Sequence, residues 1–147
     1  STRQPLTLRA SKEPQMNPDQ IEPAPRRGGV IRPSELPGYS PANHHGTTNV
    51  RLVGPETGAR HMEVVLGEIV AGGNALPHAH PGLEQAVYVL EGTAVAGIDG
   101  KEQEVHPGDV MFFPEGVFHS IRVTSDRIRL LVVYAPPYGE DPSKVIR

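Results

Sequence analysis

At positions 78–85 the chain reads His78-Ala79-His80-Pro81-Gly82-Leu83-Glu84-Gln85, and this stretch decides how the rest of the sequence is interpreted. Side chains of a β-strand alternate between two faces, so two histidines two positions apart project to the same face. With a side-chain oxygen a few residues later, the stretch offers three ligands to one metal ion. Imidazole and oxygen ligands suit zinc, copper, iron, nickel or manganese rather than calcium. A pair of solvated histidines on an edge strand is the alternative interpretation.

The histidine stretch is part of a longer pattern with two halves. Its members, in chain order, are Gly72, His78, His80, Tyr88-Val89-Leu90-Glu91-Gly92, Gly108, Pro114, Gly116 and His119. The two halves resemble the two motifs of the cupin superfamily, whose members are small β-barrel proteins that mostly hold one metal ion. The resemblance covers roughly residues 72–124 and implies a single divalent metal ion, which would be Mn, Fe, Ni, Zn or Cu.

Length and composition limit the possible classes of protein. The chain has 147 residues, which fits one domain, and a net charge of −3 with both signs scattered. We therefore expect no nucleic-acid partner. No apolar run approaches the ~20 residues that span a bilayer, and no signal-peptide pattern opens the chain. Cysteine is absent, so the ligands must be nitrogen or oxygen, and a cytoplasmic location is compatible with this composition.

Turn-forming residues indicate the fold class. The chain contains 16 glycines and 16 prolines, which favours short strands over long helices. Asp99-Gly100 stands between two alternating runs and predicts a hairpin. About nine or ten strands are expected, and this periodicity by itself predicts an all-β sandwich or barrel. The cupin resemblance narrows the prediction to a jelly-roll β-barrel, also called a double-stranded β-helix.

The chain divides into one barrel domain and two terminal segments. We expect the barrel at 28–140, a flexible tail or an extended N-terminal arm at 1–27, and a peripheral C-terminal tail at 141–147. Prolines interrupt the first segment, and its apolar residues are too sparse to offset the entropy of ordering it. Within the barrel we expect a short strand at 28–32. We also expect a turn at 72–74 that separates a strand at 61–70 from the histidine strand.

The resemblance implies His78, His80 and His119 as metal ligands and leaves two candidates for a fourth. The family places a glutamate after the second histidine with three or four residues between them, which gives Glu84 or Gln85 here. It also places a glycine seven positions after that ligand. Gly92 lies seven positions after Gln85 and eight after Glu84. We therefore predict Gln85, with Glu84 as the alternative. Neighbouring residues of a strand point to opposite faces, so only one of them can face the metal unless a bulge intervenes.

The fourth ligand bears on the chemistry. Three histidines and a glutamate leave a divalent ion with a net charge of about +1, whereas a glutamine leaves it at +2. A negative ligand favours oxygen chemistry, and a neutral one favours a Lewis acid. Cupins with glutamate include dioxygenases and decarboxylases, and some with glutamine are lyases or isomerases of small sugar acids. The sequence predicts an enzyme acting on a small oxygenated molecule, with a dioxygenase as the first expectation. A lyase or isomerase of a small carbonyl compound or sugar acid is the alternative. A module that binds a small molecule or a metal without catalysis is the further alternative.

Apolar residues near the ligands predict the lining of a substrate pocket. The expected lining residues are Val87, Val89, Phe112, Val117 and Ile121. The pair His44-His45 lies in an irregular region and is expected to be solvated, and no acid–base residue stands out. We also expect a homodimer, because the strand at 62–70 carries apolar residues on both faces. The segment at Val30-Ile31 is the expected strand that pairs with the other subunit.

Overall fold

The computed structural model describes residues 28–147, and the predicted tail or arm at 1–27 lies outside these residues. The described part contains nine strands and three short 3₁₀ helices. The strands are β1 (Gly38–Tyr39), β2 (His44–Val53), β3 (Glu63–His78), β4 (Glu84–Glu91), β5 (Ala94–Ile98), β6 (Lys101–Val105), β7 (Val110–Phe113), β8 (His119–Val123) and β9 (Arg127–Ala135). The 3₁₀ helices are η2 (Pro33–Glu35), η3 (Pro55–Thr57) and η4 (Pro142–Lys144). No helix among the described residues is long and apolar enough to cross a membrane.

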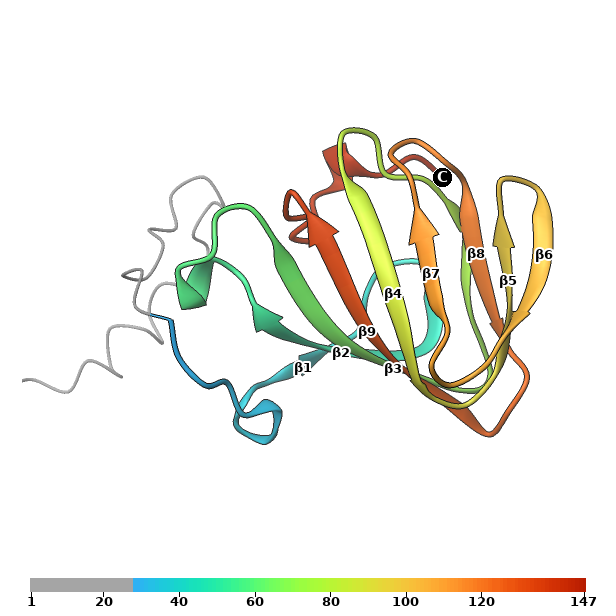
Figure 1. Cartoon of the computed structure of the whole chain (residues 1–147), viewed down its shortest axis with the longest axis horizontal. Coiled ribbons are helices and arrows are strands. Elements are labelled where there is room, and N and C mark those ends of the chain that lie inside the picture. Colours follow the sequence, from blue (N-terminus) through green and yellow to red (C-terminus); the bar gives the residue numbers. More distant parts are fainter. Residues whose placement is uncertain (1–27) are drawn as a thin grey trace, which may run out of the picture.

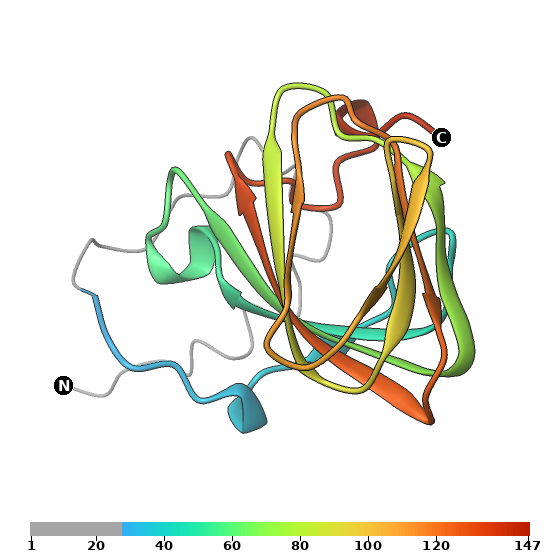
Figure 2. The ribbon, with the colours of Figure 1, turned by 45° about the vertical axis from the view of Figure 1, so that its right-hand side comes forward.

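All strands belong to one antiparallel sheet. Its main order is β6-β5-β8-β3-β9-β4-β7, and β2 pairs with β3 and with β1 outside this path. Figures 1 and 2 show the sheet curling back on itself, so that β4 and β7 face β5, β6 and β8 across an interior. This arrangement confirms the predicted all-β barrel. The hairpin predicted at Asp99-Gly100 joins β5 to β6, and both turn residues have positive φ.

Alternation along the strands builds the core. In β4, Gln85, Val87 and Val89 are buried while Tyr88 and Leu90 are exposed. Facing strands supply the rest of the core, which consists of Val65, Ile69, Ala75, Ala94, Ala96, Val105, Met111, Phe113, Ile121, Val123, Ile128, Leu130 and Val132. Burying such side chains contributes roughly 1.5–3 kcal/mol each for the larger ones. Every second position of β4 is thereby fixed toward the interior.

Gly92 marks the end of β4 and cannot be replaced easily. Its φ is +84°, and a Cβ at this position would collide with the backbone carbonyl oxygen of Arg127. Only glycine satisfies both the backbone conformation and the close approach. This glycine therefore fixes the chain at the end of β4, just after the register shift between Val89 and Glu91 in the pairing with β9.

Two predictions about the strands were wrong. The turn expected at 72–74 does not form, because β3 continues through it to His78. Gly72 has φ +75°, and a Cβ on Gly73 would strike the carbonyl oxygens of Val70 and His45. The pairing of β3 with β9 ends at Val70, and its pairing with β8 begins at Asn74. The two glycines bend the strand between these points. The strand expected at 28–32 is also absent, and Val30 is 80 % exposed.

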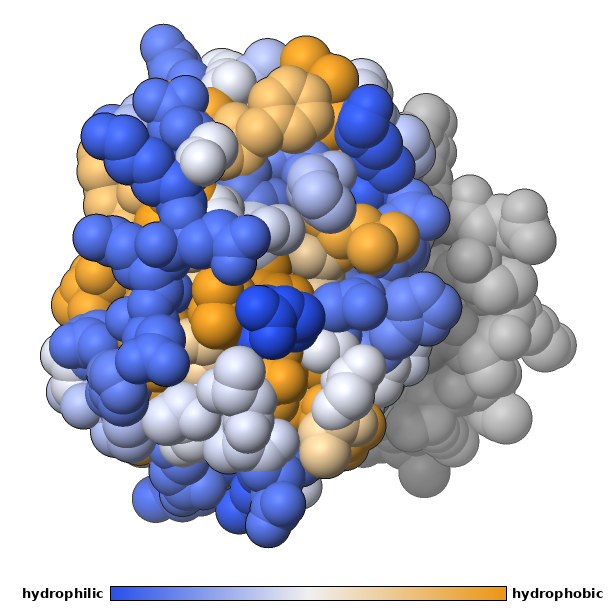
Figure 3. All heavy atoms as spheres, turned by 90° about the vertical axis from the view of Figure 1, so that its right-hand side faces the viewer, coloured by the Kyte–Doolittle hydropathy of each residue, from blue (hydrophilic) through white to orange (hydrophobic). Residues whose placement is uncertain are grey.

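The outer face of β4 and β7 carries the exposed apolar residues Tyr88, Leu90, Val110 and Phe112. Tyr88 pairs with Val110 across the two strands, so these side chains form a continuous patch. On the side of the barrel shown in Figure 3, hydrophobic areas are interleaved with hydrophilic side chains. A patch of this kind is typical of an interaction surface.

The homodimer stays a prediction, and this patch is the surface on which to test it. If two copies pair through β4 and β7, Val110→Lys places a charge in the contact and should convert the dimer to single chains. Light scattering at micromolar concentration measures the mass. Glu104→Lys on the polar strand β6 is the control and should leave the mass unchanged. A single-chain mass for the unaltered protein would reject the homodimer.

Candidate metal centre

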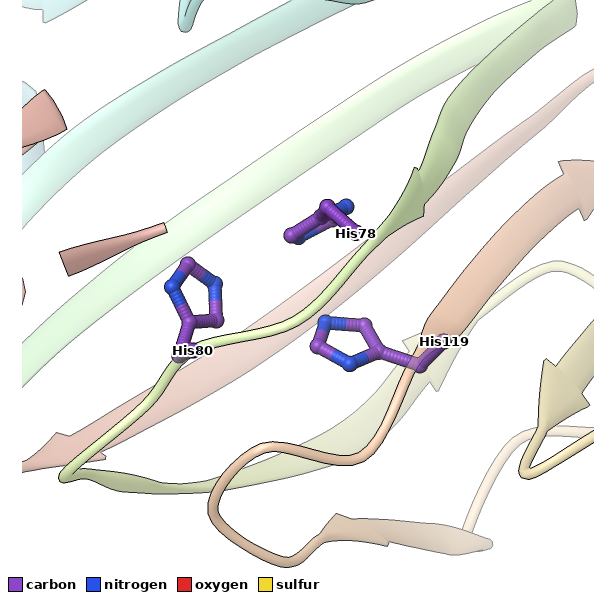
Figure 4. Close-up of side chains that lie close together, drawn as sticks. All are labelled: His78, His80 and His119. Carbon is purple, nitrogen blue, oxygen red and sulfur yellow. The ribbon is translucent and has the colours of Figure 1, made fainter. Parts of the chain in front are cut away.

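Three histidines, two at strand ends and one in the loop after β3, meet inside the barrel. His78 ends β3, His80 follows it, and His119 begins β8, where it pairs in register with His78. One potential ligand atom from each lies within 4.8 Å of those of the other two. Figure 4 shows the three rings directed toward a common point. The histidines are only 7, 3 and 4 % exposed, so solvent does not account for their polar atoms.

Backbone carbonyls orient all three rings in the same way. In each ring, Nδ1 lies within hydrogen-bond distance of a carbonyl oxygen. The pairs are His78 with Leu76 (2.7 Å), His80 with Lys144 (2.9 Å) and His119 with Val117 (3.1 Å). A carbonyl can only accept, so Nδ1–H donates and Nε2 keeps its lone pair. Nε2 of His80 and of His119 is buried and has no hydrogen-bond partner among the described residues. These orphaned nitrogens fit a metal ion.

Gln85 and Glu84 point to opposite sides of β4. Gln85 is 7 % exposed and lines the same cavity as His78 and His119, while Glu84 is exposed. The amide oxygen Oε1 of Gln85 is buried and has no hydrogen-bond partner in the described part of the chain. An unsatisfied buried acceptor costs about 1–3 kcal/mol unless something binds to it. The orientation agrees with the spacing to Gly92, and metal binding by Gln85 itself stays a prediction.

Burial lowers the pKa of the site histidines. The pKa of His80 falls to about 4 and that of His119 to about 3, in both cases mainly because the charged ring would be desolvated. Burial also lowers the pKa of His78, although the hydrogen bond to the Leu76 carbonyl acts in the opposite direction. The rings are therefore neutral at pH 7, and neutral imidazole is the form that binds metals.

The metal-free protein should lose stability as the pH falls below about 6.5. The unfolded chain binds protons at His80 and His119 near pH 6.5, whereas the folded chain resists them until about pH 4 and about pH 3. The free energy of unfolding is therefore at its full value above pH 6.5. Below that pH it decreases by up to about 1.4 kcal/mol per pH unit for each histidine. Urea unfolding of the chelator-treated protein between pH 7.5 and 5 measures this slope. An unchanged midpoint over this range would contradict the prediction.

Aromatic rings enclose the histidines. Phe113 stacks on the ring of His119, with centroids 3.9 Å apart and an interplanar angle of 7°. The ring of Tyr138 lies 4.4 Å from that of His80, and the ring of Tyr134 lies 5.7 Å from it. These contacts hold the rings of His80 and His119 in place and exclude water from one side of each of these two rings.

The cavity beside the histidines has a volume of about 500 Å³, its open mouth included. Its lining residues are His44, Thr47, Asn49, Gly67, Ile69, Ala75, His78, Gln85, Val87, Phe113, His119, Ile121, Leu130, Val132 and Tyr134. The predicted residues Val87 and Ile121 are among them.

Three of the predicted lining residues lie elsewhere. Phe112 is 51 % exposed on the outer face, because Gln85 pairs with Phe113, and paired residues of antiparallel strands share a face. Phe113 therefore takes the place predicted for Phe112. Val89 is fully buried in the core beyond the cavity, and Val117 lies in the loop before β8 and does not line it.

His44 lines the cavity, although the sequence interpretation placed it in a solvated loop. It begins β2, and a register shift follows at Gly46, whose φ is +67°. The extra residue brings His44 and Thr47 to the same face despite their odd spacing. The rings of His44 and His78 are 6.1 Å apart, and Nδ1 of His44 lies 3.2 Å from the Thr47 hydroxyl oxygen. Burial lowers the pKa of His44 to about 4, so it is neutral at pH 7.

The segment expected to form a C-terminal tail, 141–147, lies against the centre. Ala79, between the two histidines, exchanges two backbone hydrogen bonds of 2.8 Å with Ile146. The same segment supplies the Lys144 carbonyl that accepts from His80. Figure 1 shows it beside the loop that joins β3 to β4.

Comparisons with known proteins agree with this architecture. A family model described as a cupin domain matches residues 65–134. A curated protein named Beta-D-galactosidase Rv1717, from Mycobacterium tuberculosis, is 36% identical over 114 residues, which are 76% of this chain and 97% of that protein.

Two solved structures show the same fold. The polyketide cyclase RemF from Streptomyces resistomycificus is similar with a TM-score of 0.68 and 25% identity, covering 76% of this chain and 81% of its own. KdgF from Halomonas sp. has a TM-score of 0.69 at 17% identity, covering 78% of this chain and 98% of its own. The second likeness concerns the fold alone.

Proposed function

Since this chain belongs to the cupin superfamily and has its jelly-roll barrel, we propose that it is a metal-dependent enzyme that acts on a small neutral carbonyl compound by Lewis-acid catalysis. The observation that carries the proposal is the buried, unpartnered amide oxygen of Gln85 beside the three histidines. His78, His80 and His119 would hold the ion through Nε2, and Gln85 through Oε1. A bound divalent ion would supply a Lewis acid that polarises a carbonyl oxygen, and four neutral ligands leave its charge undiminished.

The cavity wall supports a neutral substrate. Apart from the ligands and His44, Thr47 and Asn49, its lining is apolar or aromatic. None of the described lining residues is a lysine or arginine, so a phosphate group has no cationic side chain to pair with there. None is an aspartate or glutamate either, so the two-carboxylate mechanism of most glycosidases is not supported. The name of the M. tuberculosis relative supports a sugar-like compound as substrate, although the two-carboxylate mechanism would not act on it here.

His44 is the residue proposed to move a proton. Its Nδ1 lies 3.2 Å from the Thr47 hydroxyl oxygen, and in the tautomer whose Nδ1–H donates to that oxygen, Nε2 has the lone pair that accepts a proton. It lines the same cavity as His78 but lies outside the cluster of three histidines that approach within 4.8 Å. A neutral imidazole at this distance from the ligands can take a proton from a carbon next to the polarised carbonyl. The apolar wall formed by Val87, Ile121 and Val132 excludes water from that carbon.

The dioxygenase predicted from the sequence is the second candidate. Iron sites that use oxygen commonly include a carboxylate ligand, which stabilises the oxidised ion. The carboxylate that the sequence offered as a ligand, Glu84, is exposed and points away from the cavity. The non-catalytic binding module ranks third, because His44 has the position of an acid–base residue.

The test is proton exchange without oxygen. The zinc- or manganese-loaded protein is incubated anaerobically in D₂O with neutral hydroxy-aldehydes and hydroxy-ketones, and deuterium entering next to the carbonyl is followed by NMR. His44→Gln should reduce the exchange rate by about 100-fold or more, the usual contribution of a positioned base. His45→Gln, at the exposed neighbouring position, is the control. Turnover only when oxygen is present would favour the dioxygenase, and no exchange with any of these compounds would contradict the proposal.

A further inference from the structure

We propose that Glu63 is a positioning residue of the metal centre, and this proposal rests on the metal site of the proposed function. The Glu63 carboxylate holds the segment 137–146, and that segment fixes the direction of the His80 ring. Glu63 lies at the start of β3, on the inner face, and touches none of the three histidines through any hydrogen bond among the described residues.

The Glu63 carboxylate is buried, and both of its oxygens accept hydrogen bonds. It is 2 % exposed. One oxygen accepts a hydrogen bond of 2.6 Å from Nε of Arg51 on β2, and the other accepts from the backbone N–H groups of Tyr138 (3.0 Å) and Gly139 (2.8 Å). Burying a carboxylate is costly unless it is paired and hydrogen-bonded in this way. Its two backbone partners follow β9, so the carboxylate fixes the point where the chain leaves the sheet.

Hydrogen bonds within the segment 138–144 hold the chain in one conformation after it leaves β9. The Asp141 amide donates to the Tyr138 carbonyl (3.1 Å), and the Lys144 amide donates to the Asp141 carbonyl (2.9 Å). The Asp141 carboxylate caps η4 by accepting from the Ser143 amide at 2.9 Å. Fixing Tyr138 at one end therefore fixes Lys144 near the other end.

His80 depends on this segment more than the other two histidines do. The carbonyl partners of His78 and His119 lie two residues away in their own strands or loops, whereas the partner of His80 lies 64 residues away, at Lys144. His80 itself lies outside the strands. The ring of Tyr138, the residue whose amide Glu63 holds, also lies 4.4 Å from that of His80. A change at Glu63 should therefore reach the metal through His80 alone.

Cobalt(II) binding to the metal-free protein tests the proposal, with the dissociation constant measured from visible absorption. Glu63→Gln keeps the shape and removes the charge, and it should raise this constant about 10-fold, the lower end for outer partners of metal ligands. Glu56→Gln is the matched control. Glu56 pairs with the same Arg51 at 3.3 Å but is exposed and binds no part of the segment, so its replacement should leave the constant unchanged.

The distinguishing measurement is the same change in a His80→Ala background. If Glu63 acts through His80, Glu63→Gln should no longer alter the dissociation constant there, because coupled residues are not additive. An equal 10-fold loss with and without His80 would show a merely structural role and overturn the proposal. Asp141→Ala, at a half-buried position that caps η4, should weaken cobalt binding in the same His80-dependent way and serves if Glu63→Gln does not fold.

A measurement without metal separates this proposal from the proposed function. In the ¹⁵N-labelled metal-free protein, the Nδ1–H of His80 should exchange slowly with solvent, and Asp141→Ala should accelerate its exchange. That result, together with no cobalt binding by the unaltered chain, would reject the metal site while the positioning of His80 holds. Unchanged exchange in Asp141→Ala would overturn the positioning role whether or not cobalt binds.

Discussion

Replacing His119 by alanine should lower the affinity of this protein for zinc or manganese by more than about 100-fold, which is the upper range for outer partners of metal ligands. His119 offers a buried Nε2 with no other partner among the described residues. Its removal takes away a ligand and also leaves Phe113 without the ring on which it stacks. The alanine variants of His78 and His80 should behave in the same way.

The loss of metal should appear as a loss of stability. Metal at 1,000 times its dissociation constant stabilises the folded state by about 4 kcal/mol, and a 100-fold weaker site retains about 1.4 kcal/mol at the same concentration. Elemental analysis of protein purified without added metal and thermal unfolding with and without chelator measure the two effects. His106→Ala, at an exposed turn position, is the control. Full metal occupancy in all three alanine variants would contradict the assignment of these histidines as metal ligands.

Replacing Gln85 by glutamate should keep the metal and lower the Lewis-acid activity. The new carboxylate would occupy the position of the amide oxygen that now has no partner. It reduces the net charge of the centre from +2 to about +1, so a substrate carbonyl is polarised less. A loss of at least about 10-fold in proton exchange corresponds to about 1.4 kcal/mol of transition-state stabilisation. The same anion stabilises the oxidised ion, so the redox potential of an iron-loaded centre should fall.

Glu84→Gln is the matched control, because it changes the charge at the adjacent position on the outer face of β4. Metal content and exchange rate should both stay as they are. A metal-bound structure with a Glu84 oxygen at ~2.0–2.2 Å from the ion and Gln85 turned outward would contradict the assignment. It would also move the preference toward the dioxygenase.

The orientation of Gln85 could be predicted because a local constraint fixes it. The family resemblance places a glycine seven positions after the fourth ligand, and this short spacing points to Gln85. Gly92 has to be glycine, because a Cβ there would collide with the Arg127 carbonyl. The hairpin at Asp99-Gly100 was equally local, as both residues adopt positive φ. Predictions of this kind depend on a few consecutive residues and therefore need no knowledge of the partner strand.

Features that depend on pairing between distant strands were missed. Phe113 lines the cavity in place of the predicted Phe112 because of the register of β4 against β7, and no spacing in the sequence reveals this register. His44 faces the cavity because of a bulge at Gly46, and a bulge reverses alternation without a reliable sequence signal. Glu63 lies within the strand predicted at 61–70, and its role could not be predicted because its partners are residues 51, 138 and 139.

The carbonyl that orients His80 lies 64 residues further along the chain, and this separation has a consequence for the order of assembly. While the chain is being synthesised, the residues from His78 to His80 leave the ribosome long before Lys144 has been added. During that interval two flexible imidazoles can chelate a metal loosely and release it again. Tight capture requires pairing between distant strands, which is slow in β-rich folds. An ion bound at the proposed centre would therefore be selected at the end of folding, by the metals then available in the surroundings.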